Sequence, residues 1–423
     1  MFNKLTIDDY DLLGKKVLLR VDFNVPLNEQ GNITSDKRIV ESLPTIKRLQ
    51  EKGAKIIICS HLGRPDGKPN PKFSLKPVAE RLRKLLESPV FFNGDLVTPE
   101  NRKFINNMEN GEIFMLENLR FDPGEENNDL NFAKKLASIA DIFCNDAFGT
   151  MHRAHASTVG VAKLLPNCIG LLVQKEITMF DKILSKPQKP VLAILGGAKI
   201  KDKINMIHNI LNVANKVIIG GAMAYTFLVA KGYNVGASTI EKDKVPIAKM
   251  LLDIAEKNHV KIILPVDHVV AQEFSFMADS ITIPTSGFKA NDIGMDIGMH
   301  TIKLFKNEIN SARTIFWNGP MGVFEFDKFS VGTRKIAEAV AESKATTIVG
   351  GGDSISALSK FGLEKKITHI STGGGASLQY LEGNGLVGLK AISDKIEVWY
   401  EIYLWQLENE FFRPRCKQIY KRF

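Results

Sequence analysis

PVLAILGGAKIKDK, residues 190–203, is the stretch that decides the fold. The apolar run that begins at Pro190 fits a buried strand, the pair Gly196-Gly197 ends it, and isoleucines at helical spacing follow from Ile204. A strand, a glycine turn and a helix start that carries lysines bring backbone N–H and ammonium groups to one place, where they can bind a phosphate. A tight strand-to-helix turn with solvated lysines is the alternative interpretation.

Apolar runs alternate with helix-patterned stretches along the rest of the chain. This alternation predicts an α/β protein with two doubly wound parallel-sheet domains, joined by a hinge helix, with an active-site cleft between them. The runs of the first half lie at residues 16–24, 55–65, 113–121 and 141–157. Those of the second half lie at residues 190–199, 216–222, 261–267, 314–322, 346–354 and 368–377.

The residues that follow each run differ between the two halves. In open α/β sheets, ligands bind beyond the carboxyl ends of the strands. The first-half runs lead into polar and charged side chains: Asp22, Asn24, His61, Arg64, Arg120, His152, Arg153 and His155. The second-half runs lead into glycines: Gly196, Gly197, Gly220, Gly221, Gly319, Gly350–Gly352 and Gly373–Gly375. We therefore expect a side-chain anion site on the first half and a backbone site for a nucleotide on the second, as in a two-substrate enzyme.

Length and composition agree with two domains and a small anionic ligand. The 423 residues suffice for two cores, and the net charge of +9 suits an anionic partner. Basic residues are not interleaved with aromatics in the body of the chain, so we expect no nucleic-acid partner. Without a long apolar stretch or a signal-like N-terminus, we expect a cytoplasmic protein with no membrane span. We expect the four cysteines, Cys59, Cys144, Cys168 and Cys416, to be mostly buried thiols in a reducing compartment.

Prolines at positions 166, 187 and 190 mark the boundary between the halves. A helical pattern at 171–184 lies within it, which predicts domains at residues 1–170 and 190–377 with a hinge helix at 171–189. Residues 395–423 differ from the rest, with two of the three tryptophans and a basic end. This extension is either partly disordered or an amphipathic helix on a partner or membrane surface.

Two acidic residues near the glycine turns have competing interpretations. Asp353 follows three glycines and precedes a helical pattern, so it is either an ordinary N-cap or a ligand of Mg²⁺ beside bound phosphates. The second glycine-rich strand end at 373–377 favours the metal. Glu325 either accepts hydrogen bonds from ribose hydroxyls or is a solvated loop acid.

One motif is a decoy. The spacing Gly383-x-Gly385-x-x-Gly388 matches the dinucleotide fingerprint, but it follows a helix-like segment rather than a strand, which argues against an NAD-dependent dehydrogenase. A Walker A motif and a HEXXH metal site are absent from the sequence.

These motifs together resemble the phosphoglycerate kinase family. The substrate-side motifs are RVDFNVP (20–26), SHLGRP (60–65), ENLRF (117–121) and DAFG (146–149), followed by His152-Arg153-Ala154-His155. The nucleotide-side motifs lie at 195–203, 317–325, 350–353 and 372–377. The resemblance runs from about residue 3 to 394.

The resemblance implies reversible phosphoryl transfer between MgATP and the carboxylate of 3-phosphoglycerate, giving 1,3-bisphosphoglycerate and MgADP, in glycolysis and gluconeogenesis. It implies a monomer that bends at a hinge, with phosphoglycerate on the N-terminal domain, nucleotide on the C-terminal domain, and residues of about 378–394 folding back on the first. Residues implied to bind phosphoglycerate are Asp22, Phe23, Asn24, Arg38, His61, Leu62, Gly63, Arg64, Arg120 and Arg153. Those implied for the nucleotide are Gly197, Ala198, Lys203, Gly221, Gly294, Asn318, Glu325, Gly350, Gly351, Gly352, Asp353 and Ser354, with Mg²⁺ on Asp353. The implied catalytic groups are Arg38, Lys199, Lys203, Gly352 and Gly374.

The sequence departs from the family pattern in four places. Lys201 stands where a small residue is usual, Met299-His300 replaces Pro-Lys, Gln379 replaces an acid, and the extension has no counterpart. The main rival is a non-catalytic descendant of the same fold. The presence of Arg38, Lys199, Lys203 and Asp353 argues against it, because a binding module would not need all four.

Overall fold

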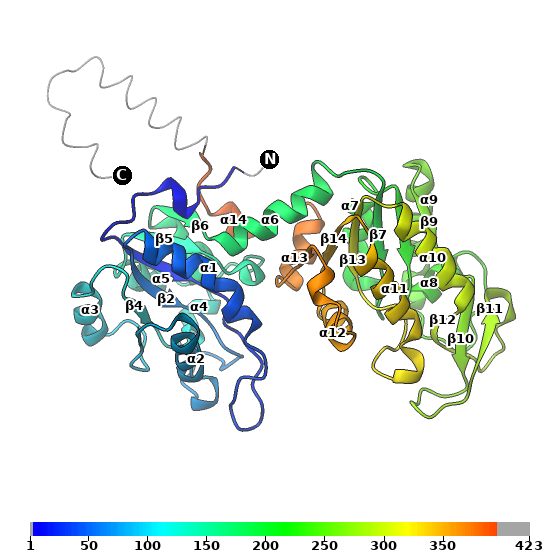
Figure 1. Cartoon of the computed structure of the whole chain (residues 1–423), viewed down its shortest axis with the longest axis horizontal. Coiled ribbons are helices and arrows are strands. Elements are labelled where there is room, and N and C mark those ends of the chain that lie inside the picture. Colours follow the sequence, from blue (N-terminus) through cyan, green and yellow to red (C-terminus); the bar gives the residue numbers. More distant parts are fainter. Residues whose placement is uncertain (1–2, 396–423) are drawn as a thin grey trace, which may run out of the picture. The chain divides into compact units, whose positions relative to one another are not determined.

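The computed structural model describes residues 3–395 of the chain. The chain divides into two compact units (Figure 1). Unit 1 is Met1–Ile177 together with the segment from Leu386, and unit 2 is Thr178–Gly385. The predicted extension at 395–423 lies, apart from its first residue, outside the described residues. Within the described part, none of the helices combines the length and apolar character that crossing a bilayer requires.

Unit 1 contains a six-stranded parallel sheet in the order β3-β4-β2-β1-β5-β6. Its strands are β1 (Lys16–Arg20), β2 (Lys55–Cys59), β3 (Val90–Phe91), β4 (Ile113–Met115), β5 (Ile142–Asn145) and β6 (Asn167–Ile169). Its helices are α1 (Lys37–Glu51), α2 (Lys76–Leu86), α3 (Pro99–Asn106), α4 (Pro123–Glu126), α5 (Leu130–Ala137) and α14 (Val387–Lys390). The strands are almost wholly buried, which is why they are continuous apolar runs rather than alternating ones.

Unit 2 contains a second six-stranded parallel sheet, in the order β15-β14-β13-β7-β8-β9. Its strands are β7 (Val191–Leu195), β8 (Lys216–Ile219), β9 (Lys261–Ile263), β13 (Thr314–Asn318), β14 (Thr346–Val349) and β15 (His369–Ile370). Its helices are α7 (Ile204–Ile210), α8 (Met223–Ala230), α9 (Val245–Lys257), α10 (Met299–Ser311), α11 (Val331–Glu342), α12 (Gly352–Lys360) and α13 (Gly375–Leu381). The α/β fold with two parallel sheets is therefore confirmed.

In both sheets the strand order runs outward from a central strand in two directions. The central strands are β1 and β7, and the direction reverses between β1 and β5 and between β7 and β13. Ligands of open α/β sheets bind beyond the carboxyl ends of the strands at such a reversal. The topology therefore places one candidate site in each unit.

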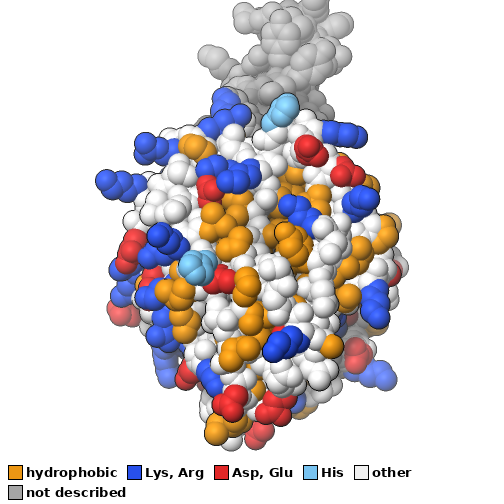
Figure 2. Space-filling view, turned by 90° about the vertical axis from the view of Figure 1, so that its right-hand side faces the viewer, with side chains coloured by type: hydrophobic (Ala, Val, Ile, Leu, Met, Phe, Trp, Pro, Cys, Tyr) orange, Lys and Arg blue, Asp and Glu red, His pale blue; other side chains and the backbone are white. Residues whose placement is uncertain are grey.

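A small antiparallel sheet in unit 2 was not predicted. It has the order β11-β10-β12, formed by β10 (Asp267–Ala271), β11 (Ser280–Pro284) and β12 (Ile293–Ile297). Near it, Phe274, Phe276 and Met277 are exposed. Figure 2 looks onto this end of the molecule and shows hydrophobic side chains between lysines and arginines. No residue of β11 is buried, so this strand lacks the continuous apolar pattern of a buried strand.

The helix α6 (Leu171–Leu184) occupies the helical stretch predicted near the boundary, and the division between the units falls inside it. The chain rejoins unit 1 from Leu386, whereas the family pattern suggested about residue 378. In unit 1, the backbone N–H of Gly388 donates to the carbonyl of Met151 (2.8 Å) and that of Leu5 donates to Ser393 (3.1 Å). The C-terminal segment therefore packs against the start of the chain and the turn after β5.

Candidate active site

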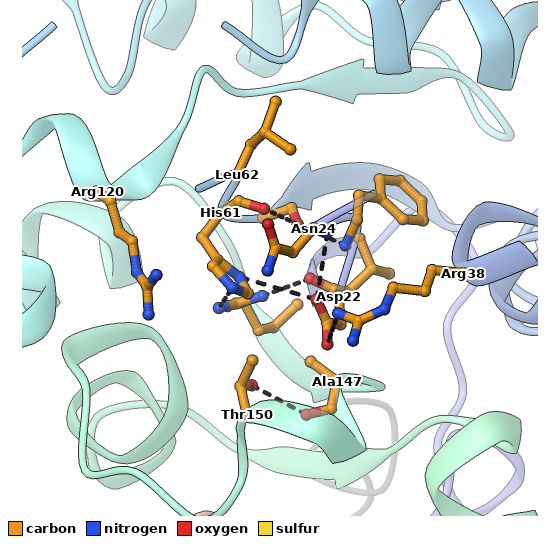
Figure 3. Close-up of polar contacts among 12 residues, drawn as sticks. Asp22, Asn24, Arg38, His61, Leu62, Arg120, Ala147 and Thr150 are labelled. Carbon is orange, nitrogen blue, oxygen red and sulfur yellow. Dashed lines mark hydrogen bonds and ion pairs between the residues drawn. The ribbon is translucent and has the colours of Figure 1, made fainter. Parts of the chain in front are cut away.

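The candidate site of unit 1 lies at the carboxyl ends of β1 and β2. Asp22 follows β1, and its Oδ2 accepts a hydrogen bond from Nη1 of Arg38 on α1 at 2.6 Å (Figure 3). Asn24 lies two residues further on, and its Oδ1 accepts the N–H of Gly63 at 2.9 Å. The loops after β1 and β2 are thus tied together. Arg38 keeps 35% of its side chain exposed, so its remaining N–H groups can reach a ligand.

Arg120 reaches the same loop from the turn after β4. Its Nη1 donates to the carbonyl of Gly63 at 2.8 Å, and its Nη2 lies 3.2 Å from Glu126. Its Nε is buried and has no hydrogen-bond partner within the described residues. Burial, more than any charged neighbour, lowers the pKa of this arginine. Arg64 and Arg153 are exposed.

Phe23 and Leu62 support the loops of this site rather than presenting polar side chains to a ligand. Both side chains are buried. The N–H of Phe23 donates to Ser60 Oγ at 2.9 Å, and Leu62 exchanges hydrogen bonds with the Asn118 side chain at 3.2 and 2.7 Å. Their backbone and core contacts hold the loops that carry the polar groups.

The histidines of this region are neutral. Burial first, and then the charges of Arg20, Arg120 and Arg38, hold the pKa of His61 well below its ordinary value. Burial first, and then the charges of Arg20, Arg120 and Arg153, lower the pKa of His155 to about 4. Guanidinium groups that suppress the protonation of nearby imidazoles create a positive potential, which attracts an anion.

Arg20, Ser157 and Glu125 belong to this region but were not among the predicted site residues. All three are fully buried. Arg20 is part of the quoted motif at 20–26, but its position at the end of an apolar strand gave no sign of a function. Glu125 and Ser157 lie on α4 and on a π-helical turn at Ala156–Gly160, and no pattern in the sequence links them.

In unit 2, the predicted strand, glycine turn and helix are present as β7, Gly196-Gly197 and α7. The Lys203 ammonium folds back over the turn and donates to the carbonyls of Gly196 (2.6 Å) and Asn318 (3.1 Å). Burial lowers the pKa of Lys203 to about 8, and the charge of Asp353 partly opposes this shift. This lysine therefore lies at the β7–β13 reversal. Ala198 and Lys199 are exposed on the same turn.

The glycines at the turns of unit 2 differ in what surrounds them. A Cβ atom on Gly196 would lie 2.1 Å from the carbonyl oxygen of Pro320, and one on Gly221 would lie 2.5 Å from the nitrogen of Gly197. These glycines allow neighbouring turns to pack backbone against backbone. By contrast, no atom lies within 4 Å of a Cβ added to Gly352 or Gly374. Gly352 and Gly374 therefore face open space, as close approach of a ligand to the backbone requires.

Gly352 begins α12, and Gly351 is the N-cap of this helix with a φ of 91°. Asp353 is not the N-cap but lies in the first turn, where its side chain is exposed. The N-cap interpretation of Asp353 is therefore wrong. Its carboxylate remains available, and one carboxylate together with phosphate oxygens is a common environment for Mg²⁺.

The remaining predicted nucleotide residues differ in exposure. Asn318 is buried and donates to the Gly350 carbonyl at 2.9 Å, and the buried Ser354 hydroxyl accepts the N–H of Gly319 at 2.5 Å. Glu325 is exposed. A Cβ on Gly294 would overlap the Tyr225 phenol, so packing alone accounts for this glycine.

The departures from the family pattern do not disturb these contacts. Lys201 and Met299 are exposed, Met299 as the first residue of α10, and Gln379 is partly buried on α13. The backbone N–H of His300 donates to Asp267 at 3.0 Å, an ordinary contact of a helix start. Gly383 and Gly385 follow helix α13 rather than a strand, as predicted.

Most of the chain is similar to phosphoglycerate kinases. The family model described as phosphoglycerate kinase matches residues 7–384. The phosphoglycerate kinase of Clostridium tetani is 50% identical over 397 residues, which cover 93% of this chain and 99% of the relative. That of Thermosipho africanus is 51% identical over 399 residues, with coverage of 93% and 99%.

Solved structures agree with this similarity. The phosphoglycerate kinase structure from Coxiella burnetii has a TM-score of 0.84 and 40% identity, covering 92% of this chain and 98% of that one. The one from Pyrococcus horikoshii has a TM-score of 0.78 and 34% identity, with coverage of 94% and 99%. The chain belongs to the phosphoglycerate kinase family.

Proposed function

We propose that this chain transfers a phosphoryl group reversibly between MgATP and the carboxylate of 3-phosphoglycerate, giving 1,3-bisphosphoglycerate and MgADP. The observation that carries the proposal is the group of arginines and neutral histidines at the strand ends of unit 1, in a chain that belongs to this family. Unit 1 binds the acid substrate and unit 2 binds the nucleotide.

The acid substrate carries a carboxylate and a phosphate, which match the donors of unit 1. Arg38, Arg64, Arg120 and Arg153 supply guanidinium groups, which bind oxyanions through paired N–H donors. Asp22 orients Arg38 through the 2.6 Å ion pair. Neutral His61 adds a donor without adding charge to the site.

The nucleotide phosphates bind at the turns of unit 2. Gly352 and Gly374 leave room for phosphate oxygens beside backbone N–H groups, and Lys199 and Lys203 supply positive charge. Asp353 would hold Mg²⁺, which when bound neutralises charge on the phosphates.

The reaction needs no general base, because a carboxylate nucleophile is already ionised at neutral pH. Catalysis then rests on positioning and on cations arranged around the transferring group. Since each unit binds one substrate, transfer requires the substrates to be brought together. We assign that movement to a hinge at α6, in a monomeric cytoplasmic enzyme.

The test is phosphoryl transfer from MgATP to 3-phosphoglycerate by the purified full-length chain. The formation of MgADP is the quantity measured. Transfer that depends on both substrates supports the proposal. Binding of MgADP without any transfer would overturn it and favour the non-catalytic interpretation. Thermal stabilisation by each ligand separately shows which substrate fails to bind in that case.

A further inference from the structure

A continuous chain of buried polar contacts leads from α4 to His61. The carboxylate of Glu125 accepts two hydrogen bonds from Ser157, from Oγ at 2.5 Å and from the backbone N–H at 3.0 Å. The Ser157 Oγ accepts a hydrogen bond from Nε of Arg20 at 2.8 Å. Nη2 of Arg20 then lies 3.3 Å from Nδ1 of His61. Three of these residues are fully buried, and His61 is 5% exposed.

The chemistry of these groups gives every hydrogen bond in the chain one direction. An arginine has N–H donors and no acceptor, so Arg20 donates at both ends. Ser157 Oγ accepts from Arg20, and its own proton is therefore donated to Glu125. Nδ1 of His61 must likewise accept from Arg20, which requires that it carries no proton. In a neutral imidazole, the proton then resides on Nε2.

The opposite tautomer has no support in this structure. A proton on Nδ1 would face the N–H groups of Arg20. The other neighbour of this nitrogen is Oδ1 of Asp22, at 4.0 Å, which is too far for a hydrogen bond. Burial and the surrounding arginines also disfavour the doubly protonated form, since they lower the pKa of His61. Within the described residues, Nε2 has no protein hydrogen-bond partner and is free to donate to a ligand.

We propose that Glu125 and Ser157 are positioning residues for substrate binding: acting through Arg20, they fix His61 as the Nε2–H tautomer, which donates a hydrogen bond to the anionic acid substrate. This inference rests on the proposed binding of phosphoglycerate by unit 1. Glu125 has a second effect here, because its buried carboxylate offsets the buried charge of Arg20.

The first test is the tautomer itself, read from long-range ¹H–¹⁵N correlation spectra of protein labelled at histidine. The His61 signals are assigned by their absence from the His61→Gln spectrum. We expect the wild-type protein to carry the His61 proton on Nε2 at neutral pH. A proton on Nδ1, or a doubly protonated ring, would overturn the proposal. This result does not depend on catalysis, so it separates the inference from a failure of the proposed function.

The second test is the Ser157→Ala variant, which removes the acceptor for Arg20 while keeping Glu125. We expect mixed His61 tautomers and a KM for 3-phosphoglycerate raised about tenfold, with the KM for MgATP unchanged within about twofold. Glu125→Gln should change the same two quantities in the same direction. Ser42→Ala is the control, because Ser42 is equally buried and its hydroxyl bonds only within α1. A Ser157→Ala protein with a wild-type tautomer and KM would refute the role of Ser157.

Discussion

Replacing Gly196 with alanine should destabilise unit 2 and weaken nucleotide binding together. The added Cβ would lie 2.1 Å from the carbonyl oxygen of Pro320, and such contacts are rarely closer than 3.0 Å, so the two turns must separate by 3.0 − 2.1 = 0.9 Å. Overpacking of this kind costs about 1–3 kcal/mol. For a unit of this size, each kcal/mol lowers Tm by about 2–4 °C, which gives a loss of roughly 2–12 °C. The Gly196 carbonyl also accepts from Lys203, so the shift displaces that ammonium.

Scanning calorimetry and MgADP titration measure these two effects. The matched control is Gly352→Ala, since a Cβ there meets no atom within 4 Å. This variant should keep the wild-type Tm, or gain slightly from better helix propensity, yet bind MgADP more weakly because the Cβ points into the space proposed for phosphate. If Gly196→Ala melts at the wild-type temperature, the backbone-packing argument is refuted. If Gly352→Ala binds MgADP normally, the open glycine does not face the nucleotide.

Three further predictions concern the charged groups. Because burial lowers the pKa of Lys203 to about 8, this lysine loses its charge as the pH rises through that value. The affinity for MgADP, measured by calorimetric titration from pH 6.5 to 9.5, should therefore fall across about pH 8 in the wild type. A Lys203→Met variant whose affinity for MgADP depends on pH in the same way would contradict the assignment of this effect to Lys203. Arg38→Ala should lower kcat by roughly 10²–10³-fold with little change in the KM for MgATP, because one donor to the charge that develops during transfer is lost. The control is Arg48→Ala: Arg48 lies on the same helix but is paired with Asp8 at 2.7 Å, so this variant should behave like wild type in the same steady-state assay. Asp353→Asn should weaken binding of MgADP but not of ADP in the presence of EDTA, and an equal loss under both conditions would remove Asp353 from the metal site.

The sequence predicted the strand-to-loop transitions of both sheets because these depend on local pattern. Continuous apolar runs ending in Asp22 or Gly196 indicate buried parallel strands, and the residues after them lie at one edge of the sheet by geometry alone. Two short strands lie outside the predicted runs: β3, with two residues, and β6, with three.

The expectation of buried thiols can be compared with the structure for three of the four cysteines. Cys59, Cys144 and Cys168 are buried and free, as expected, and Cys144 and Cys168 lie opposite each other on the neighbouring strands β5 and β6 as free thiols. Burial raises the pKa of Cys59 to about 12, so this thiol is a poor nucleophile. Cys416 lies outside the described residues.

What the sequence by itself determined was the α/β class, the two sheets and the kind of residue at each strand end, because strand burial and turn chemistry depend on neighbours in the chain. Only the tertiary structure separated Gly196, held by the packing of two turns, from Gly352, which faces open space. Only the structure, too, linked Glu125, Ser157 and Arg20 to His61. These four residues come from four separate segments of the chain, and their hydrogen bonds exist because folding brings distant segments together and removes water from between them.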